Sequence, residues 1–286
     1  MILFFAFLIG LTSAILFPYF IEISFWWSPL FFLGGVLTYA ILLAIIFYIL
    51  PKTVFRTPSM DEPVRRNILH EICRFTQSIC GIKIRVTGLD IIPTGNTLVF
   101  VGNHYANWDI IVMMFVLKKY KVSFVYKSDI DKWPYIGMWA KIIGGMPVYR
   151  DNDRKSAEII VEVGKRVKDG HNYIVFPEGT RSRNGYLADF RHGAVKPAIK
   201  GAADVVYFSI DNTYKVTYNW PRRTIVHVDF IKAIKGEDIS KLTTIQLAED
   251  AKVEITKRQE ENRAIYKELI VPNHIRTKKN RKFKRE

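Results

Sequence analysis

His104 and Asp109 are well suited to proton chemistry and stand five positions apart in the block NHYANWD, residues 103–109. Five helical positions at about 100° each leave two side chains about 140° apart, so one regular helix cannot join them. A turn that leads into a helix can, with Asn107 as its N-cap. Asp109 would then accept from one ring nitrogen of His104 and leave the other to take a proton from a hydroxyl. A structural histidine beside a helix-start Asp109 is the alternative.

A second block, FPEGTRS at residues 176–182, is suited to hold an anion. Gly179 and Thr180 separate Glu178 from Arg181. Arg181 offers a planar fork for bidentate phosphate binding, and backbone N–H groups around Gly179 can add to the cradle. Glu178 would orient the arginine or contact a substrate hydroxyl. A salt-bridged surface turn is the alternative.

Strand-like and helix-like stretches alternate between and around these blocks. Apolar, β-rich runs predict strands at 97–101, 122–126, 146–149, 173–176, 205–210 and 224–230, and helical patterns predict helices at 67–80, 153–168 and 245–269. This alternation predicts an α/β fold with a largely parallel mixed sheet flanked by helices. Because each block directly follows a strand, and sites in such folds gather at the carboxyl ends of strands, we expect one shared site.

The N-terminus predicts a membrane anchor. Residues 1–21 and 29–50 are uncharged, and Glu22 is the one charged side chain before residue 51. Each run is about long enough to cross a ~30 Å hydrocarbon layer. A cleaved signal peptide is the alternative, but the chain lacks a basic leading region and a second apolar run follows. Two helices in residues 1–55 are therefore expected, either spanning or re-entrant.

Basic residues around this anchor indicate its orientation. Lys52, Arg56, Arg65 and Arg66 follow the second apolar run, which places the remainder of the chain in the cytoplasm by the positive-inside rule. We divide that remainder into a catalytic domain, 56–270, and a basic tail, 271–286. Formal net charge is +15, and the tail is either a contact for anionic lipid or a solvated end. Nucleic acid is not an expected partner.

The remaining candidates for metal or redox chemistry are few. Cys73 and Cys80 lie within the predicted helix 67–80 and fit no metal or redox spacing, so we expect core thiols. The six histidines are scattered and form no two-His cluster. The sequence therefore predicts no metal site.

Together, the N-H-x4-D and F-P-E-G-T-R-S blocks, in this order, resemble the glycerolipid acyltransferases of the lysophosphatidic acid acyltransferase family over about residues 65–230. The resemblance implies transfer of a fatty acyl group from acyl-CoA or acyl carrier protein to the sn-2 hydroxyl of 1-acylglycerol 3-phosphate, giving phosphatidic acid. His104 would be the general base and Asp109 its orienter. The acceptor supplies the hydroxyl, so neither an acyl-enzyme nor a further cofactor is implied.

Further residues resemble looser parts of the family pattern. Lys127 and Arg150 match a lysine and an arginine that flank a Pro/Gly-containing stretch in the family, and they are expected as phosphate contacts beside Arg181. An ordinary surface charge is the alternative for each. The chain departs from the family in the predicted strand 205–210, which lacks the usual proline, and at Ala106, where a small hydroxyl residue is common. These departures leave head-group and acyl-chain preference open. Glycerol 3-phosphate or another lysophospholipid as acceptor, and a non-catalytic lipid-binding protein of the same fold, are the alternatives.

Overall fold

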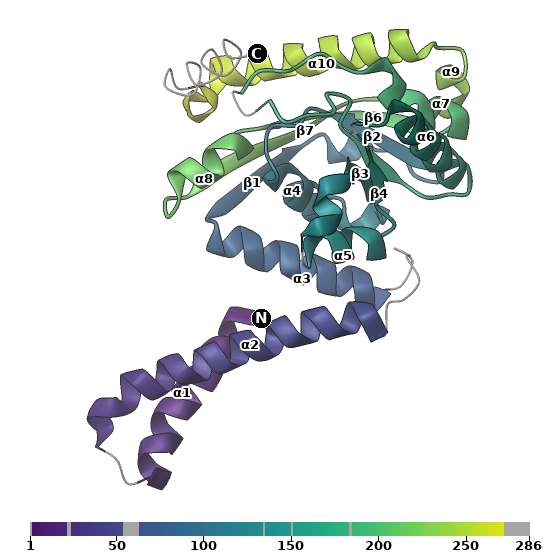
Figure 1. Ribbon diagram of the computed structural model, residues 1–286. Helices are drawn as coiled ribbons and strands as arrows, with labels where there is room; N and C mark the ends of the chain where they lie inside the picture. Colours follow the sequence, from purple (N-terminus) through teal and green to yellow (C-terminus); the bar gives the residue numbers. More distant parts are fainter. Residues whose placement is uncertain are drawn as a thin grey trace.

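A mostly parallel sheet lies at the centre of the larger domain (Figure 1). The computed structural model describes residues 2–21, 24–53, 63–133, 135–149, 151–182 and 185–271. Within these residues the sheet has seven strands in the order β1-β7-β6-β2-β5-β3-β4. Their bounds are β1 Ile82–Thr87, β2 Leu98–Gly102, β3 Ser123–Lys127, β4 Met146–Val148, β5 Tyr173–Val175, β6 Asp204–Asp211 and β7 Thr224–Ile234. β6 and β7 run antiparallel and the other neighbouring strands run parallel, which confirms the predicted fold class.

Helices cover both faces of this sheet. In Figure 1, α10 (Thr244–Ile265) lies on one face with α6 (Asp153–Lys168) and α7 (Lys196–Gly201), and α3 (Pro63–Ile79), α4 (Trp108–Val116) and α5 (Ile136–Ile142) lie on the other. The alternation of β2 accounts for both layers. Leu98 and Phe100 pack into the core on the α4 side, and Val99 and Val101 pack into the core that contains α6 and α10. Successive strand residues point to opposite faces, so one short run nucleates two cores.

The sequence located most of these elements closely, but some bounds differ and some elements were not predicted. Helix α6 has the predicted bounds, and β4 lies at the edge of the sheet, a position where proline is tolerated. Helix α3 begins at Pro63 instead of 67, and α10 ends at Ile265, before a 3-10 turn at Lys267–Leu269. Strand β7 extends to Ile234 instead of 230, and the short helices α5 and α7 were not predicted. Strand β1 was also missed. Its alternating apolar and polar residues, IKIRVT, were an available signal.

Two N-terminal helices form a hairpin apart from this domain (Figure 1). α1 (Ile2–Ile21) and α2 (Ser28–Thr53) are long and apolar enough to cross a membrane, by length and composition. Their large apolar side chains are mostly exposed, as Phe20 shows at 74%. A Cβ added at Gly35 would lie 2.4 Å from the Ser13 hydroxyl oxygen, so glycine permits the close helix approach typical of membrane helix pairs.

Helix α3 buries one of the basic residues that follow the anchor and one of the two cysteines. Arg65 is buried and donates to the Ile142 carbonyl at 2.9 Å, which ties α3 to α5. Cys73 is buried, and burial raises its thiol pKa to about 12, as expected of a core thiol. Cys80 is partly buried just after α3. Arg56 and residues 272–286 of the predicted basic tail lie outside the described residues.

Candidate active site

His104 and Asp109 meet at the carboxyl end of β2. His104 Nδ1 lies 2.7 Å from Asp109 Oδ2, the contact expected from their spacing. Asp109 is fully buried, whereas 18% of the His104 side chain is exposed. The imidazole also stacks on Phe176, with ring centroids 4.4 Å apart. Because Asp109 occupies Nδ1 and the stack fixes the ring plane, the second nitrogen, Nε2, remains to meet a ligand.

One carboxylate oxygen organises the whole turn. Asp109 Oδ2 also accepts the backbone N–H groups of Tyr105 at 2.6 Å and Ala106 at 2.8 Å. These contacts bend the chain from β2 into α4, which is how residues unsuited to one helical face come together. Asn107 occupies the predicted N-cap position but makes no side-chain cap hydrogen bond. Its side-chain oxygen instead accepts from Arg181 NH1 at 2.6 Å.

Glu178 belongs to the second sequence block and contacts the first. It is buried, and its Oε1 accepts the backbone N–H of His104 at 2.7 Å. Its Oε2 accepts from the Ser182 hydroxyl and, at 3.0 Å, from Ala188 N. Burial raises the pKa of Glu178, and these hydrogen bonds act in the opposite direction. The carboxylate thus braces the His104 backbone, a different task from the expected contact with the arginine or with substrate.

The second block continues directly after Glu178 with Gly179, Thr180 and Arg181. Gly179 has φ +60°, which favours glycine, and a Cβ there would approach the Arg191 side chain to 3.1 Å. Thr180 is exposed, and Arg181 is held beside the His104 turn by its bond to Asn107. The two blocks are therefore brought to one edge of the sheet, because β2 and β5 are parallel neighbours.

Asn103 fixes the end of β2 against the next strand. It is fully buried, its Nδ2 donates to the Ile210 carbonyl at 2.7 Å, and its Oδ1 accepts from Ile210 N at 2.9 Å. This clamp holds the start of the His104 turn in register with β6.

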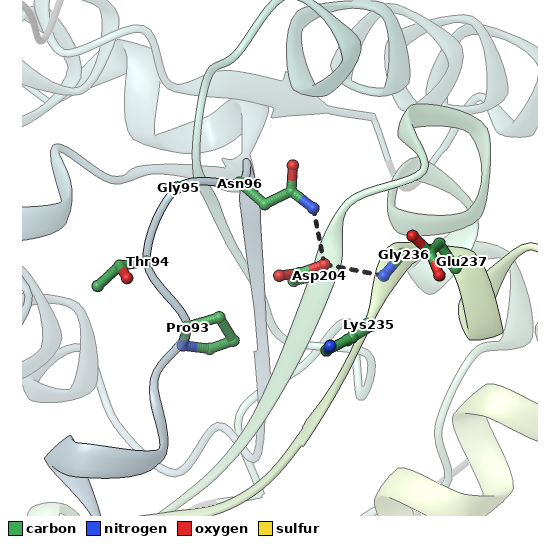
Figure 2. A pocket seen from close by; sticks show the side chains of 8 residues that line it. All are labelled: Pro93, Thr94, Gly95, Asn96, Asp204, Lys235, Gly236 and Glu237. Carbon is green, nitrogen blue, oxygen red and sulfur yellow. Dashed lines mark hydrogen bonds between the residues drawn. The ribbon is translucent and has the colours of Figure 1, made fainter.

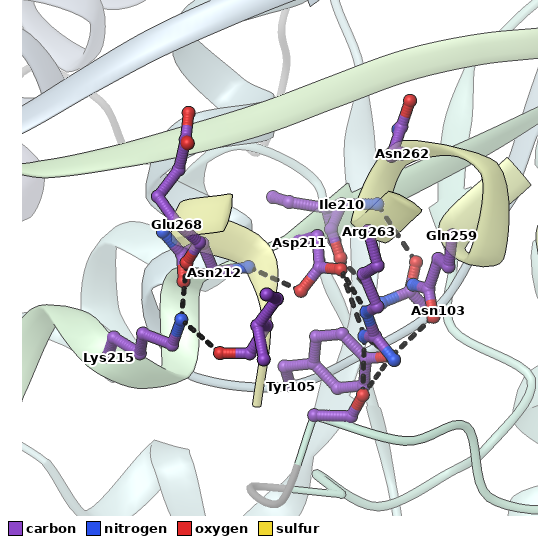
Figure 3. A network of polar contacts seen from close by, with 12 residues as sticks. Asn103, Tyr105, Ile210, Asp211, Asn212, Lys215, Gln259, Asn262, Arg263 and Glu268 are labelled. Atoms are coloured by element: carbon purple, nitrogen blue, oxygen red, sulfur yellow. Dashed lines mark hydrogen bonds and ion pairs between the residues drawn. The ribbon is translucent and has the colours of Figure 1, made fainter. Parts of the chain in front are cut away.

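A buried polar network behind the turn was not foreseen (Figure 3). The Tyr105 hydroxyl donates to Gln259 Oε1 at 2.6 Å and accepts from Arg263 NH2 at 3.3 Å. Arg263 in turn pairs with Asp211 at 2.9 Å. Burial raises the pKa of Tyr105 well above its ordinary value, so the phenol stays protonated. Gln259 and Arg263 lie one turn apart on α10, a spacing shared by most charged helices, so the sequence carried no specific signal.

Two further phosphate contacts were predicted, Lys127 and Arg150. Lys127 ends β3 and pairs with Asp129. Arg150 lies outside the described residues, so its role stays a prediction. In the part of the chain that the structure describes, no three His, Cys, Asp or Glu side chains are grouped so that they could hold a metal ion.

A polar cavity of about 370 Å³ opens at the opposite end of the sheet (Figure 2). Asp204, the first residue of β6, accepts there from Asn96 Nδ2 at 3.0 Å and from Gly236 N at 2.8 Å. These bonds join the amino end of β6 to neighbouring loops. The cavity is thus remote in the fold from the carboxyl strand ends that carry His104.

Comparison with known proteins finds a family model and several similar chains. The Acyltransferase family model matches residues 83–211. A chloroplastic 1-acyl-sn-glycerol-3-phosphate acyltransferase of Arabidopsis thaliana is 32% identical over 159 residues, which cover 54% of this chain and 44% of that protein. The enzyme of that name from Borreliella burgdorferi is 30% identical over 47% of this chain and 54% of its own length. A lyso-ornithine lipid O-acyltransferase of Rhizobium meliloti is 31% identical over 50% of this chain and 46% of its own length.

The chain thus spans about half the length of these curated relatives. A solved structure, the 1-acyl-sn-glycerophosphate acyltransferase of Thermotoga maritima, has a TM-score of 0.59 and 22% identity. The match covers 78% of this chain and 96% of the Thermotoga chain. At 22% identity, this likeness supports the fold alone.

Proposed function

We propose that the chain is a member of the Acyltransferase family, whose model matches residues 83–211, and that it transfers a fatty acyl group from an acyl thioester to the sn-2 hydroxyl of 1-acylglycerol 3-phosphate. The observation that carries the proposal is the 2.7 Å contact between His104 Nδ1 and buried Asp109, with Arg181 held beside the same turn. Relatives named for this reaction support the choice of acceptor.

The proton chemistry follows from which ring nitrogen is occupied. With Nδ1–H donating to Asp109 Oδ2, the neutral imidazole of His104 carries its lone pair on Nε2. Nε2 takes the proton of the acceptor hydroxyl as the hydroxyl oxygen attacks the thioester carbonyl carbon. The carbon–sulfur bond then breaks, and the imidazolium returns its proton to the leaving thiolate. The products are an ester and a free thiol.

Asp109 and Glu178 keep the base in place for that step. Asp109 fixes the tautomer and its negative charge stabilises the imidazolium that forms. Glu178 holds the His104 backbone from the other block, so the imidazole and the arginine keep one geometry. General-base assistance of this kind contributes on the order of 10²–10⁴-fold in rate.

Arg181 is the proposed anchor for the phosphate of the acceptor. A phosphate monoester carries about −1.5 to −2 charges at pH 7, and a guanidinium can meet two of its oxygens at once. Gly179 and Thr180 supply the turn that places Arg181 beside Asn107. Lys127 and Arg150 remain proposed secondary contacts.

The anchor suits substrates that reside in a bilayer. α1 and α2 would keep the site at the membrane surface, and the basic residues after α2 would place the domain on the cytoplasmic face. The donor, acyl-CoA or acyl carrier protein, is a co-substrate, and the scheme uses no further cofactor.

A second acceptor is favoured by one specific observation. A relative at 31% identity is named a lyso-ornithine lipid O-acyltransferase, and the acceptor in that name is an ornithine lipid instead of a glycerophosphate. The same His104 chemistry would serve it, but a phosphate anchor would not be required. Arg181 therefore distinguishes the two acceptors.

The test is acyl transfer by the full chain in vesicles, with both donors and with lysophosphatidate, glycerol 3-phosphate and lyso-ornithine lipid as acceptors. We expect lysophosphatidate to be preferred and His104→Ala to lower kcat by ~10²–10⁴-fold. His171→Ala, at an exposed histidine after α6, is the matched control and should keep the wild-type rate. Acylation of none of these acceptors would refute the function, and an unchanged rate in His104→Ala would refute the base.

A further inference from the structure

The segment from Thr217 to Arg223, which we call the α8 loop, combines exposed aromatic and basic side chains. It comprises most of α8 (Val216–Asn219) and the turn after it, and it reads TYNWPRR. Tyr218 is 57% and Trp220 is 60% exposed, and both arginines are exposed as well. Figure 1 shows α8 projecting at an edge of the domain. Single exposed aromatic side chains are common, but two of them grouped with two arginines on one ordered turn make a candidate surface for a partner.

Hydrogen bonds hold the loop in this shape. Trp220 Nε1 donates to the Ile79 carbonyl at 3.2 Å, and Trp220 N donates to the Val216 carbonyl at 3.2 Å. Asn219 Nδ2 donates to Thr224 Oγ1 at 2.9 Å, and the Arg222 N–H closes the turn onto Asn219 at 2.7 Å. The rings are therefore presented by an ordered turn.

The loop is joined to the candidate active site and to the side of the domain that faces the anchor. Trp108 Nε1 donates to Thr217 Oγ1 at 3.1 Å, and Trp108 is the first residue of α4, directly before Asp109. Ile79, which accepts from Trp220, ends α3 and is itself 50% exposed. In Figure 1, α3 lies between the sheet and the α1–α2 hairpin.

We propose that the α8 loop rests on the surface of an anionic phospholipid bilayer, with Tyr218 and Trp220 among the headgroups and Arg222 and Arg223 against lipid phosphates. Tyr and Trp favour the membrane–water interface because one end of each ring is apolar and the other is polar. Arginines beside an anionic surface add an attraction that salt screens. The proposal rests on the proposed function for the bilayer it invokes. The contact would keep the turn that carries His104 near the lipid that supplies the proposed acceptor.

Fluorescence quenching of the full chain in vesicles tests the contact. The vesicles contain phosphatidylglycerol and phosphatidylcholine brominated near the top of the acyl chain. We expect Trp220→Phe to lose a quenched part of the emission. The control is the double variant Trp220→Phe with Val253→Trp, which has a tryptophan at an exposed position of α10 on the other face of the sheet. Compared with Trp220→Phe alone, it should add only unquenched emission. Trp220→Phe with Tyr218→Trp should restore the quenching, which also shows that the loop is folded.

Charge is tested in the same assay. Arg222→Gln with Arg223→Gln should reduce quenching of Trp220 in phosphatidylglycerol vesicles to its value in phosphatidylcholine alone, and high salt should do the same to the wild type. Quenching of Trp220 no greater than that of the tryptophan at position 253, or equal in neutral and anionic vesicles, would overturn the proposal. Because no acyl donor is present, this result is independent of whether the chain transfers acyl groups.

Discussion

Replacing Asp109 separates the charge of this side chain from its role in holding the turn. Asp109 Oδ2 accepts three donors at 2.6–2.8 Å. In Asp109→Asn the amide oxygen can occupy the same place and keep all three. The amide nitrogen then takes the place of Oδ1, which is buried and has no hydrogen-bond partner among the described residues. A buried unpaired polar group costs about 1–3 kcal/mol, so we expect a folded but less stable protein.

The rate should fall more than this loss of stability implies. Asp109→Asn removes the negative charge beside the imidazolium that forms when His104 takes a proton. We therefore expect kcat to fall by ~10²–10⁴-fold, the whole range of general-base assistance, with KM for the acceptor little changed. Asp109→Ala also leaves the N–H groups of Tyr105 and Ala106 without their acceptor. Each of these two unpaired groups costs about 1–3 kcal/mol, so the free energy of unfolding of Asp109→Ala should fall by roughly 2–6 kcal/mol.

Initial rates with a labelled acyl thioester and lysophosphatidate, together with thermal midpoints, measure both effects. Asp153→Asn is the matched control, because Asp153 also lies in the first turn of a helix but is exposed. It should change neither quantity. A folded Asp109→Asn protein with the wild-type kcat would show that the carboxylate charge plays no part in the reaction.

Three further predictions follow from the same geometry. Arg181→Ala should raise KM for lysophosphatidate by ~10–100-fold, from the ~1.5–3 kcal/mol of a charged hydrogen bond, and acceptor titrations should show no change for lyso-ornithine lipid. Tyr105→Phe removes the hydroxyl that donates to Gln259 and accepts from Arg263, while Arg263 keeps its pair with Asp211, and we expect kcat to fall with KM unchanged. Steady-state rates at a temperature where both proteins are folded check this, and a rise in KM with kcat unchanged would contradict it. Burial raises the pKa of Asp211 to about 6, so between pH 4 and 6 the folded protein keeps a proton that the unfolded chain releases. The wild type should therefore lose stability, relative to Asp211→Asn, as pH rises through that window, and parallel thermal midpoints of the two proteins from pH 4 to 7 would refute the assignment.

Short windows of the sequence determined the elements and the reacting groups. Alternation with period two and helical spacing are local properties, so the strands before both blocks and helix α6 could be located from the residues themselves. Because parallel strands share one carboxyl edge, a block after β2 and a block after β5 could be expected to meet. The spacing of His104 and Asp109 even required a turn where the structure has one.

The tertiary structure decided which distant residues support those groups. Nothing local in Glu178 indicates that it accepts the His104 N–H, because that bond depends on β5 lying directly beside β2 in the sheet order. Tyr105 contacts Gln259 and Arg263 because α10 packs across the sheet. Asn107 accepts from Arg181 instead of capping α4, because the second block lies beside it. Contacts between remote segments depend on how strands are ordered and helices laid across them, and the period of a single strand or helix does not encode that order.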